Sequence, residues 1–563
     1  MSAATGGGIS SAPPTAGPAA WPHDWREQRW AAIGGPWDVL IVGGGITGAG
    51  ILRAAAREGL RALLVERDDF ASGTSSRSSK LVHGGLRYLA SGQPRVTYES
   101  VRERERLLRE LPGLVERIGF LMPTYRGDHP GRLAYALGLT LYDLLAGDRT
   151  RHRHYDRAAF ELLAPHLATE GLRGGYRYDD ARTDDARLTL RTVLEAVAGG
   201  GAAVNRVAAE GLLRDARGEV VGVDLRDLTT ERTAEARAGI VVNATGAWAD
   251  RLRGEVGAAP RIRPLRGSHL VFPAWRLPVA QAISFLHPED RRPVFVIPWE
   301  GATVYGTTDV DSPLDAEPAV SADEAGYLMA GLEARFPSLD LRLDDALSSI
   351  AGVRPVIGSG KADPSRESRD HVVWQERGLL TVTGGKLTTF ELIARDALRA
   401  IERWLRAARS PAGPGATVAR EQSGAPGEPP AAAGELGGLD PVARQRLVGR
   451  YGGAATDLVA AAAPDELEAV PGTPTLWAEL RWAARAEGVV HLDDLLLRRV
   501  RLGLLLPEGG RAELTRVRAI AGPELGWDDA RWVAEEAAYT ALWRRQHGLP
   551  GAAAATAAER DRP

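Results

Sequence analysis

The stretch WDVLIVGGGITGAG, residues 37–50, predicts a strand, a glycine turn and a helix in immediate succession. Residues 38–42 form the predicted buried strand, and residues 49–56 continue the predicted helix. The three glycines Gly43, Gly45 and Gly48 have G-x-G-x-x-G spacing, which permits a tight turn, close approach of a pyrophosphate and close helix–strand packing. The helix N-terminus then offers N–H groups and a partial positive charge to phosphates. This stretch therefore predicts a dinucleotide site.

A second predicted strand, residues 61–65, ends at Glu66, which lies 21 residues after Gly45. An acid at this spacing accepts a hydrogen bond from a ribose 2′-hydroxyl and repels a 2′-phosphate, so FAD or NAD is favoured over NADP. A lone glycine triplet would be weak evidence, because many such matches are structural turns. The ordered set of strand, turn, helix, strand and acid is much more specific.

Length and composition restrict the class of protein. The chain has 563 residues, enough for two or three domains, and a formal net charge of −3, which gives no basic field for nucleic acid. It contains no cysteine, which excludes disulfides, thiolate catalysis and cysteine-held metal sites. Neither an apolar run of 18 residues nor a secretory signal is seen, so we expect a cytoplasmic protein.

Two further loops carry dense polar chemistry. Residues 70–88, FASGTSSRSSKLVHGGLRY, combine hydroxyls, glycines and cations that can donate to a flavin and its diphosphate; a solvated surface loop is the alternative. Residues 384–389, GGKLTT, form a predicted glycine turn that opens a helix. Three of the 70 basic residues are lysines, and Lys80 and Lys386 lie in these two loops. A lysine kept against such an arginine bias indicates a position where a guanidinium does not fit; chance is the alternative.

Taken in order, the motifs resemble the FAD-dependent glycerol-3-phosphate dehydrogenases of the D-amino-acid-oxidase-type flavoprotein superfamily. The resemblance rests on GTSSRSSKLVHGGLRYL (73–89), DDARL (184–188), NATGAWAD (243–250), RGSHLVF (266–272), FVIPW (295–299), GTTDV (306–310), GVRP (352–355), SRD (368–370) and GGKLTTF (384–390). It covers about residues 35–545, and HLDDLLLRRVRLG (491–503) is similar to the family's C-terminal domain.

The predicted fold class is α/β, with a Rossmann-like FAD-binding domain built from discontinuous segments, an antiparallel β-sheet substrate domain and a helical C-terminal domain. We expect a lead-in over 1–35 that is disordered over residues 1–20, the oxidoreductase region over 36–409 and a linker over 410–434. The helical domain is expected over 435–545, followed by a tail over 546–563 that is frayed from Leu549 onward. Within the oxidoreductase region, residues 36–90, 175–250 and 345–409 are assigned to FAD binding, and residues 91–174 and 251–344 to the substrate domain.

The resemblance implies that FAD takes a hydride from C2 of sn-glycerol 3-phosphate, yielding dihydroxyacetone phosphate, and that electrons then pass to a quinone. The implied cofactor contacts are Gly43, Gly45, Ile46, Thr47, Gly48, Glu66, Arg67, Thr74, Ser75, Ser79, Lys80, His83, Gly85, Val207, Thr245, Gly246, Gly385, Lys386, Leu387 and Thr388.

The implied substrate contacts are Arg87, Arg354, Arg369, Lys386 and Thr308. We expect Arg87 and Arg369 to hold the phosphate, because a dianion favours forked cationic donors. Arg354 and Lys386 are expected near the C2 hydroxyl, where cations lower its pKa. His269 is the candidate proton acceptor, with a buried core histidine as the alternative, which makes the catalytic set Arg354, His269 and Lys386. No metal is expected.

Several alternatives stay open. An α-glycerophosphate oxidase would pass electrons to oxygen, and a flavin-binding module would not catalyse. The acids Asp179, Asp180, Asp184 and Asp185 resemble a metal cluster, but helix capping or solvation is favoured because no histidine is near in sequence. The basic run 498–501 could face lipid headgroups, although a solvated helix face is favoured. Peripheral contact with the cytoplasmic face of a membrane and a homodimer stay open, as do the quinone type and the role of residues 1–20.

Overall fold

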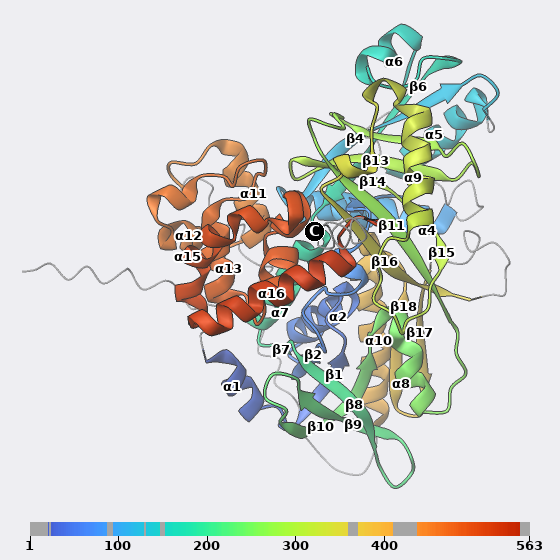
Figure 1. Ribbon diagram of the computed structural model, residues 1–563. Coiled ribbons are helices and arrows are strands. Elements are labelled where there is room, and N and C mark those ends of the chain that lie inside the picture. The colour runs from blue at the N-terminus through green and yellow to red at the C-terminus, as the bar shows by residue number, and fades with distance from the viewer. Residues whose placement is uncertain are drawn as a thin grey trace, which may run out of the picture.

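The computed structural model describes residues 21, 24–86, 94–128, 131–146, 152–358, 370–408 and 436–551. Within them, an eight-stranded and a ten-stranded sheet lie end to end, and a group of C-terminal helices, orange to red in Figure 1, packs beside both. The predicted disordered start, residues 1–20, and the predicted linker, residues 410–434, fall outside the described residues.

The eight-stranded sheet is centred on the first predicted strand, β1 (Trp37–Val42). Its strand order is β17 (His371–Glu376), β18 (Leu379–Gly384), β10 (Thr233–Asn243), β1, β2 (Ala62–Val65) and β7 (Ala202–Val204), and the hairpin of β8 (Val207–Arg214) and β9 (Val220–Asp227) extends β10. The pairs from β18 to β7 are all parallel. The strands that begin at residues 37, 233 and 379 are parallel neighbours in this sheet, although they are far apart in the sequence. This arrangement confirms a Rossmann-like fold built from discontinuous segments.

Helices cover this sheet because its strands are apolar on both faces, as parallel strands require. α2 (Ile46–Arg57) packs against α7 (Asp185–Ala198) and α10 (Phe390–Ala408), and all three contribute to the same buried core as β1 and β2. The lead-in helix α1 (Trp25–Ala31) and α8 (Ala249–Glu255) lie at the same end of the molecule (Figure 1).

The ten-stranded sheet is antiparallel apart from the parallel pair of β4 and β12. Its order is β15 (Val310–Asp311), β11 (Ile262–Pro273), β14 (Ala302–Gly306), β13 (Pro293–Trp299), β12 (Ala282–Leu286), β4 (Val115–Tyr125), β6 (Leu172–Thr183) and β3 (Leu81–Val82), with β16 (Ser348–Ile357) beside β11 and β5 (Arg153–Tyr155) beside β6. Its associated helices are α4 (Pro94–Glu110), α5 (Arg132–Ala146), α6 (Arg157–Leu163) and α9 (Ala322–Arg335). Strands β3, β6 and β16 belong to this sheet, although the predicted boundaries assign them to FAD binding.

The C-terminal region is helical, as predicted. It contains α11 (Pro441–Tyr451), α12 (Ala454–Ala461), α13 (Trp477–Ala486), α14 (Leu502–Leu505), α15 (Leu514–Leu525) and α16 (Asp529–Gln546). Within this predicted helical domain, Asp494–Arg499 form a π-helix, which a left-handed Arg501 (φ 63°) separates from α14. These helices share a core with β11, β14 and β16, since Trp477 and Leu480 cluster with Val271, Val304 and Ile350.

The predicted tail, residues 546–563, begins with two residues that are held in place. Gln546 and His547 are buried, and Ser349 of β16 donates its backbone N–H to the His547 carbonyl oxygen at 2.8 Å. The end of α16 is therefore anchored on β16. In the part of the chain that the structure describes, no helix combines the length and apolarity needed to cross a membrane.

Candidate active site

The glycine turn has the geometry that a pyrophosphate needs. Gly43 has φ 112°, and a Cβ at Gly48 would lie 1.9 Å from the Gly43 carbonyl oxygen, so neither position tolerates a side chain. Gly45 is the N-cap of α2 and supplies no side-chain cap. Gly45 and Thr47 are half-buried, so the α2 N-terminus stays accessible to an anion.

Glu66 lies at the end of β2, as its spacing predicts. Its carboxylate accepts hydrogen bonds from the backbone N–H of Gly44 at 2.6 Å and of Asp68 at 2.9 Å. Loss of water around this carboxyl raises the pKa of Glu66 to about 7. The N–H of Val207 donates to the Glu66 carbonyl oxygen at 2.8 Å, which brings these two predicted contacts together, whereas the neighbouring Arg67 is exposed.

Residues 68–80, the cofactor loop, bring predicted contacts to the glycine turn. Ser75 Oγ accepts a hydrogen bond from the Ile46 N–H at 2.9 Å, at the first turn of α2. Thr74 Oγ1 donates to the Val353 carbonyl oxygen of β16 at 2.5 Å. The loop thus connects the dinucleotide turn to the strand that carries Arg354.

Lys80 has a different environment from the one predicted. Its side chain is fully buried, and Nζ donates to the Asp185 carboxylate at 2.8 Å and to the Ser76 carbonyl oxygen at 2.7 Å. Burial, with the nearby Arg501, lowers the pKa of Lys80 to about 8. The Lys80 ammonium group therefore has its hydrogen-bond partners within the protein. We propose that Lys80 supports the cofactor loop rather than contacting FAD.

The GGKLTT turn follows β18 and lies against the predicted cofactor contact His83. Gly384 and Gly385 have φ 78° and 74°, and Lys386 Nζ donates to Ser100 Oγ of α4 at 3.0 Å. Thr388 Oγ1 accepts from the His83 N–H at 3.0 Å, so two loops some 300 residues apart are in contact beside Leu387 and Gly85. Thr383 of β18 also donates to the Gly246 carbonyl oxygen at 3.0 Å, next to Thr245.

On the substrate side, Arg354 of β16 is held by the turn that follows β14. Its guanidinium donates to Thr307 Oγ1 at 2.8 Å and pairs with Asp309 at 3.0 Å. A Cβ at Gly267 would lie 2.1 Å from Arg354 Nη2, so this glycine of β11 leaves room for the guanidinium. The Arg354 side chain is 21% exposed, so a ligand can contact its guanidinium.

Thr308 is organised by Glu324, which sequence reasoning missed. Thr308 Oγ1 donates to the Glu324 carboxylate at 2.7 Å, and Ser268 Oγ donates to the same oxygen at 2.8 Å. Glu324 also completes a capping box with Ser321 at the start of α9. The S-A-D-E pattern of residues 321–324 signals that box. Its second role, toward Thr308, depends on a contact distant in sequence.

His269 is a buried histidine of β11. Ser79 Oγ and His269 Nε2 share a hydrogen bond of 2.8 Å. Burial, followed by the positive charge of Arg354, lowers the pKa of His269 to about 3, so the ring is neutral at physiological pH. The two predicted phosphate ligands, Arg87 and Arg369, lie outside the described residues.

Of the two predictions about charged runs, the one for the acids is confirmed in part and the one for the arginines is wrong. Asp184 does cap α7, through the Arg187 N–H, but neither it nor Asp185 is solvated, because both are buried in ion pairs. Arg498, Arg499 and Arg501 are also buried, at 6%, 0% and 1% exposure, and do not form a solvated helix face.

Comparison with known proteins agrees with this geometry. Residues 38–391 match the family described as FAD dependent oxidoreductase, and residues 409–532 match the C-terminal domain of alpha-glycerophosphate oxidase. The glycerol-3-phosphate dehydrogenase of Mycobacterium leprae is 36% identical over 536 residues, covering 92% of this chain and 90% of that protein. The aerobic glycerol-3-phosphate dehydrogenase of Staphylococcus aureus is 38% identical over 377 residues, covering 66% and 68%.

Among solved structures, the glycerol-3-phosphate dehydrogenase from Bacillus halodurans complexed with FAD has a TM-score of 0.71 and 28% identity, and covers 92% of this chain and 97% of that one. The fold and the glycine turn thus place the chain in the class of FAD-dependent oxidoreductases. The glycine turn, the accessible N-terminus of α2 and Glu66 fit FAD as the cofactor. Within this class, the chain belongs to the FAD-dependent glycerol-3-phosphate dehydrogenases.

Proposed function

We propose that this protein oxidises sn-glycerol 3-phosphate at C2 to dihydroxyacetone phosphate and passes the electrons to a quinone. One observation carries the proposal: the cation Arg354 directly follows Val353, whose carbonyl oxygen is bound by Thr74 of the cofactor loop at 2.5 Å. A cation suited to an oxyanion therefore lies at the edge of the flavin site. The names of the relatives, all glycerol-3-phosphate dehydrogenases, support the choice of substrate.

Arg354 and Lys386 would act on the reacting hydroxyl. Both side chains are half-buried and approach from different sheets, on β16 and after β18. In a site shielded from water, two cations favour the deprotonated form of the C2 hydroxyl as hydride leaves. Thr308, fixed by Glu324, would orient a substrate oxygen, and Arg87 and Arg369 would bind the phosphate through forked donors.

His269 suits a positioning role better than that of proton acceptor. Its Nε2 already bonds Ser79, and a pKa of about 3 makes the ring a weak base. We therefore propose that neutral His269 fixes the Ser79 hydroxyl at the flavin. Histidine replacement by glutamine, which can still bond Ser79, should then retain more activity than replacement by alanine.

FAD, when bound, supplies the hydride-accepting ring. The protein contributes a helix N-terminus to the proposed flavin site. The N–H groups of residues 387–389 belong to the first turn after Lys386, and this turn continues into α10. A helix N-terminus favours negative charge, so we propose that this end stabilises the reduced, anionic cofactor.

An oxidase is the second candidate, because residues 409–532 match a C-terminal domain named for alpha-glycerophosphate oxidase. Anaerobic titration of the purified flavoprotein with sn-glycerol 3-phosphate should bleach the flavin absorbance, and an unchanged spectrum would contradict catalysis. Reoxidation then separates the acceptors. Rapid reaction with a soluble quinone and slow reaction with oxygen support the dehydrogenase, whereas rapid oxygen use with equal peroxide supports the oxidase.

A further inference from the structure

Residues 494–501 form an arginine segment that the proposed chemistry does not use. It consists of the π-helix and the left-handed residue Arg501, and its three arginines are almost completely buried. The π-helix changes the usual angular spacing of side chains, so consecutive arginines need not follow one helical face. Buried guanidinium groups are rare and require partners, so their contacts define what the segment does.

The first contact is at the start of the cofactor loop. Arg499 binds the Asp69 carboxylate through two bonds, of 2.6 and 2.9 Å, and Arg498 Nε adds a third at 2.5 Å. Asp69 itself is fully buried and also accepts from Asn205 at 2.9 Å. Two residues later, the Ala71 N–H donates to the Gly44 carbonyl oxygen of the glycine turn at 3.0 Å.

The second contact is at the far side of the same loop. Arg501 Nη2 donates to the Ser76 carbonyl oxygen at 2.8 Å, the same oxygen that Lys80 Nζ binds. Ser76 ends the short helix Thr74–Ser76, whose neighbours Ser75 and Thr74 reach the α2 N-terminus and β16. The segment thus holds the loop at both ends of the part that faces the dinucleotide turn.

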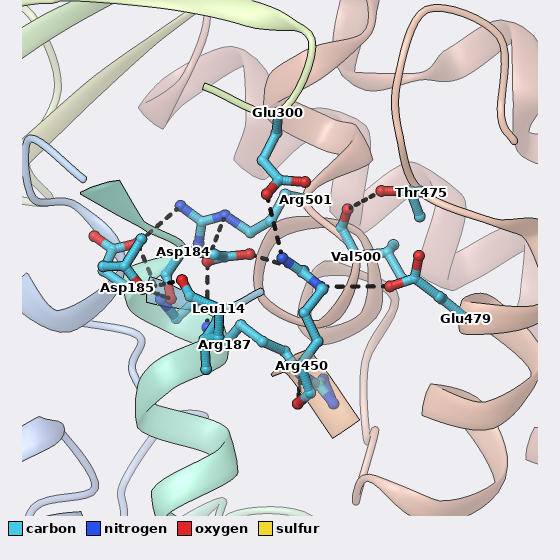
Figure 2. A network of polar contacts seen from close by, with 12 residues as sticks. Leu114, Asp184, Asp185, Arg187, Glu300, Arg450, Thr475, Glu479, Val500 and Arg501 are labelled. Carbon is cyan, nitrogen blue, oxygen red and sulfur yellow. Dashed lines mark hydrogen bonds and ion pairs between the residues drawn. The ribbon is translucent and has the colours of Figure 1, made fainter. Parts of the chain in front are cut away.

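The charges around the second contact are balanced, as Figure 2 shows for its centre, where Asp184 lies between Arg501 and Arg450. Five cations meet five carboxylates in this network: Lys80, Arg187, Arg446, Arg450 and Arg501 with Asp184, Asp185, Glu300, Glu479 and Glu487. A buried network is stable only when its members are paired, so removal of one cation leaves a carboxylate without compensation.

We propose that the arginine segment braces the flavin site, and that Arg499 and Arg501 are positioning residues that hold the cofactor loop in its FAD-binding conformation. The helical C-terminal region would then contribute to cofactor affinity without touching the cofactor. A brace of this kind lowers the entropy that the loop loses on binding FAD.

The test compares Arg501→Met with Arg446→Met. Arg446 belongs to the same network and is also buried, but its partners are Glu300 and Glu479, away from the cofactor loop. We expect Arg501→Met to raise the Kd for FAD by at least about tenfold on reconstitution of the apoprotein, and Arg446→Met to change it by no more than about twofold at a similar loss of apoprotein Tm. Equal effects on FAD affinity, or none from Arg501→Met, would overturn the proposal.

A second measurement requires no variant, in case Arg501→Met does not fold. Backbone hydrogen exchange of the wild-type protein is followed with and without FAD. We expect FAD to slow exchange in residues 68–80 and also in residues 494–501, which are coupled to them. Slower exchange in the loop, with no change in the arginine segment, would equally contradict the brace.

Discussion

Glu324 accepts a hydrogen bond of 2.7 Å from Thr308, and this contact connects the N-terminus of α9 to the turn that also holds Arg354. A single buried carboxylate therefore serves as a helix cap and orients a predicted substrate contact. Its effect on catalysis can be separated from its effect on folding.

Glu324→Gln should lower kcat/KM about 10- to 100-fold, mainly through KM, because a charge-assisted hydrogen bond contributes about 1.5–3 kcal/mol. Steady-state kinetics and thermal unfolding measure the two effects. Glu333→Gln, at an exposed position of the same helix, is the matched control and should leave both unchanged. An unaltered KM in Glu324→Gln would remove Glu324 from the site.

Arg354→Met should lower kcat about 100- to 1000-fold, as expected for loss of a donor to a developing oxyanion. The Kd for FAD should stay near the wild-type value, because the guanidinium bonds Thr307 and Asp309 and not the cofactor loop. Arg342→Met, at a side chain that is 78% exposed, controls for the loss of one positive charge. Full turnover by Arg354→Met would contradict the proposed mechanism.

The two lysines of the motif loops should behave in opposite ways. Lys80→Met should destabilise the protein by about 3–5 kcal/mol, because buried Asp185 loses the nearer of its two cations and keeps only Arg501 at 3.4 Å. Lys386→Met should change stability little, since Lys386 is half-buried, yet it should lower kcat strongly. Denaturant midpoints and turnover of both variants test this. Equal stability losses would show that the two lysines have the same role.

Two buried histidines should make the fold acid-labile. Burial lowers the pKa of His269 and of His547 to about 3, below the value of about 6.5 in the unfolded chain. The unfolded state therefore binds more protons between pH 6.5 and 3, and the stabilisation, complete above pH 6.5, decreases as pH falls through this window. Each histidine contributes a slope of up to about 1.4 kcal/mol per pH unit there.

Denaturant unfolding at pH 7 and pH 5 measures this slope, which should be smaller in His547→Gln. His491 provides the opposite control, because its bond to Glu535 raises its pKa, so its contribution is present at low pH and is lost as pH rises through the raised value. A slope unchanged in His547→Gln would show that this ring is already charged in the folded protein.

Local patterns predicted the dinucleotide fold well. The strand, turn, helix and Glu66 of residues 37–66 depend on short-range spacing, and the apolar segments at β10 and β18 show their strand character in sequence. The helical domain predicted over 435–545 likewise contains helices such as α11 and α13.

Pairing over long distances was not predictable from the same patterns. The basic run 498–501 resembles a solvated face until Asp69 and Asp185, more than 300 residues away, are brought against it. The family resemblance likewise places Lys80 at the cofactor, although its Nζ pairs with Asp185, which lies 105 residues further on. Such ion pairs form only after the fold has been set, so the type of each residue does not reveal its partner.

The strand pairing around β1 determines when the sheet can be completed during synthesis of the chain. β1 leaves the ribosome early, but it pairs with β10 and is completed by β18, and the cofactor loop is bound by arginines near residue 500. The nascent chain therefore cannot complete this sheet, or bring the arginines against the cofactor loop, until most of the polypeptide has emerged.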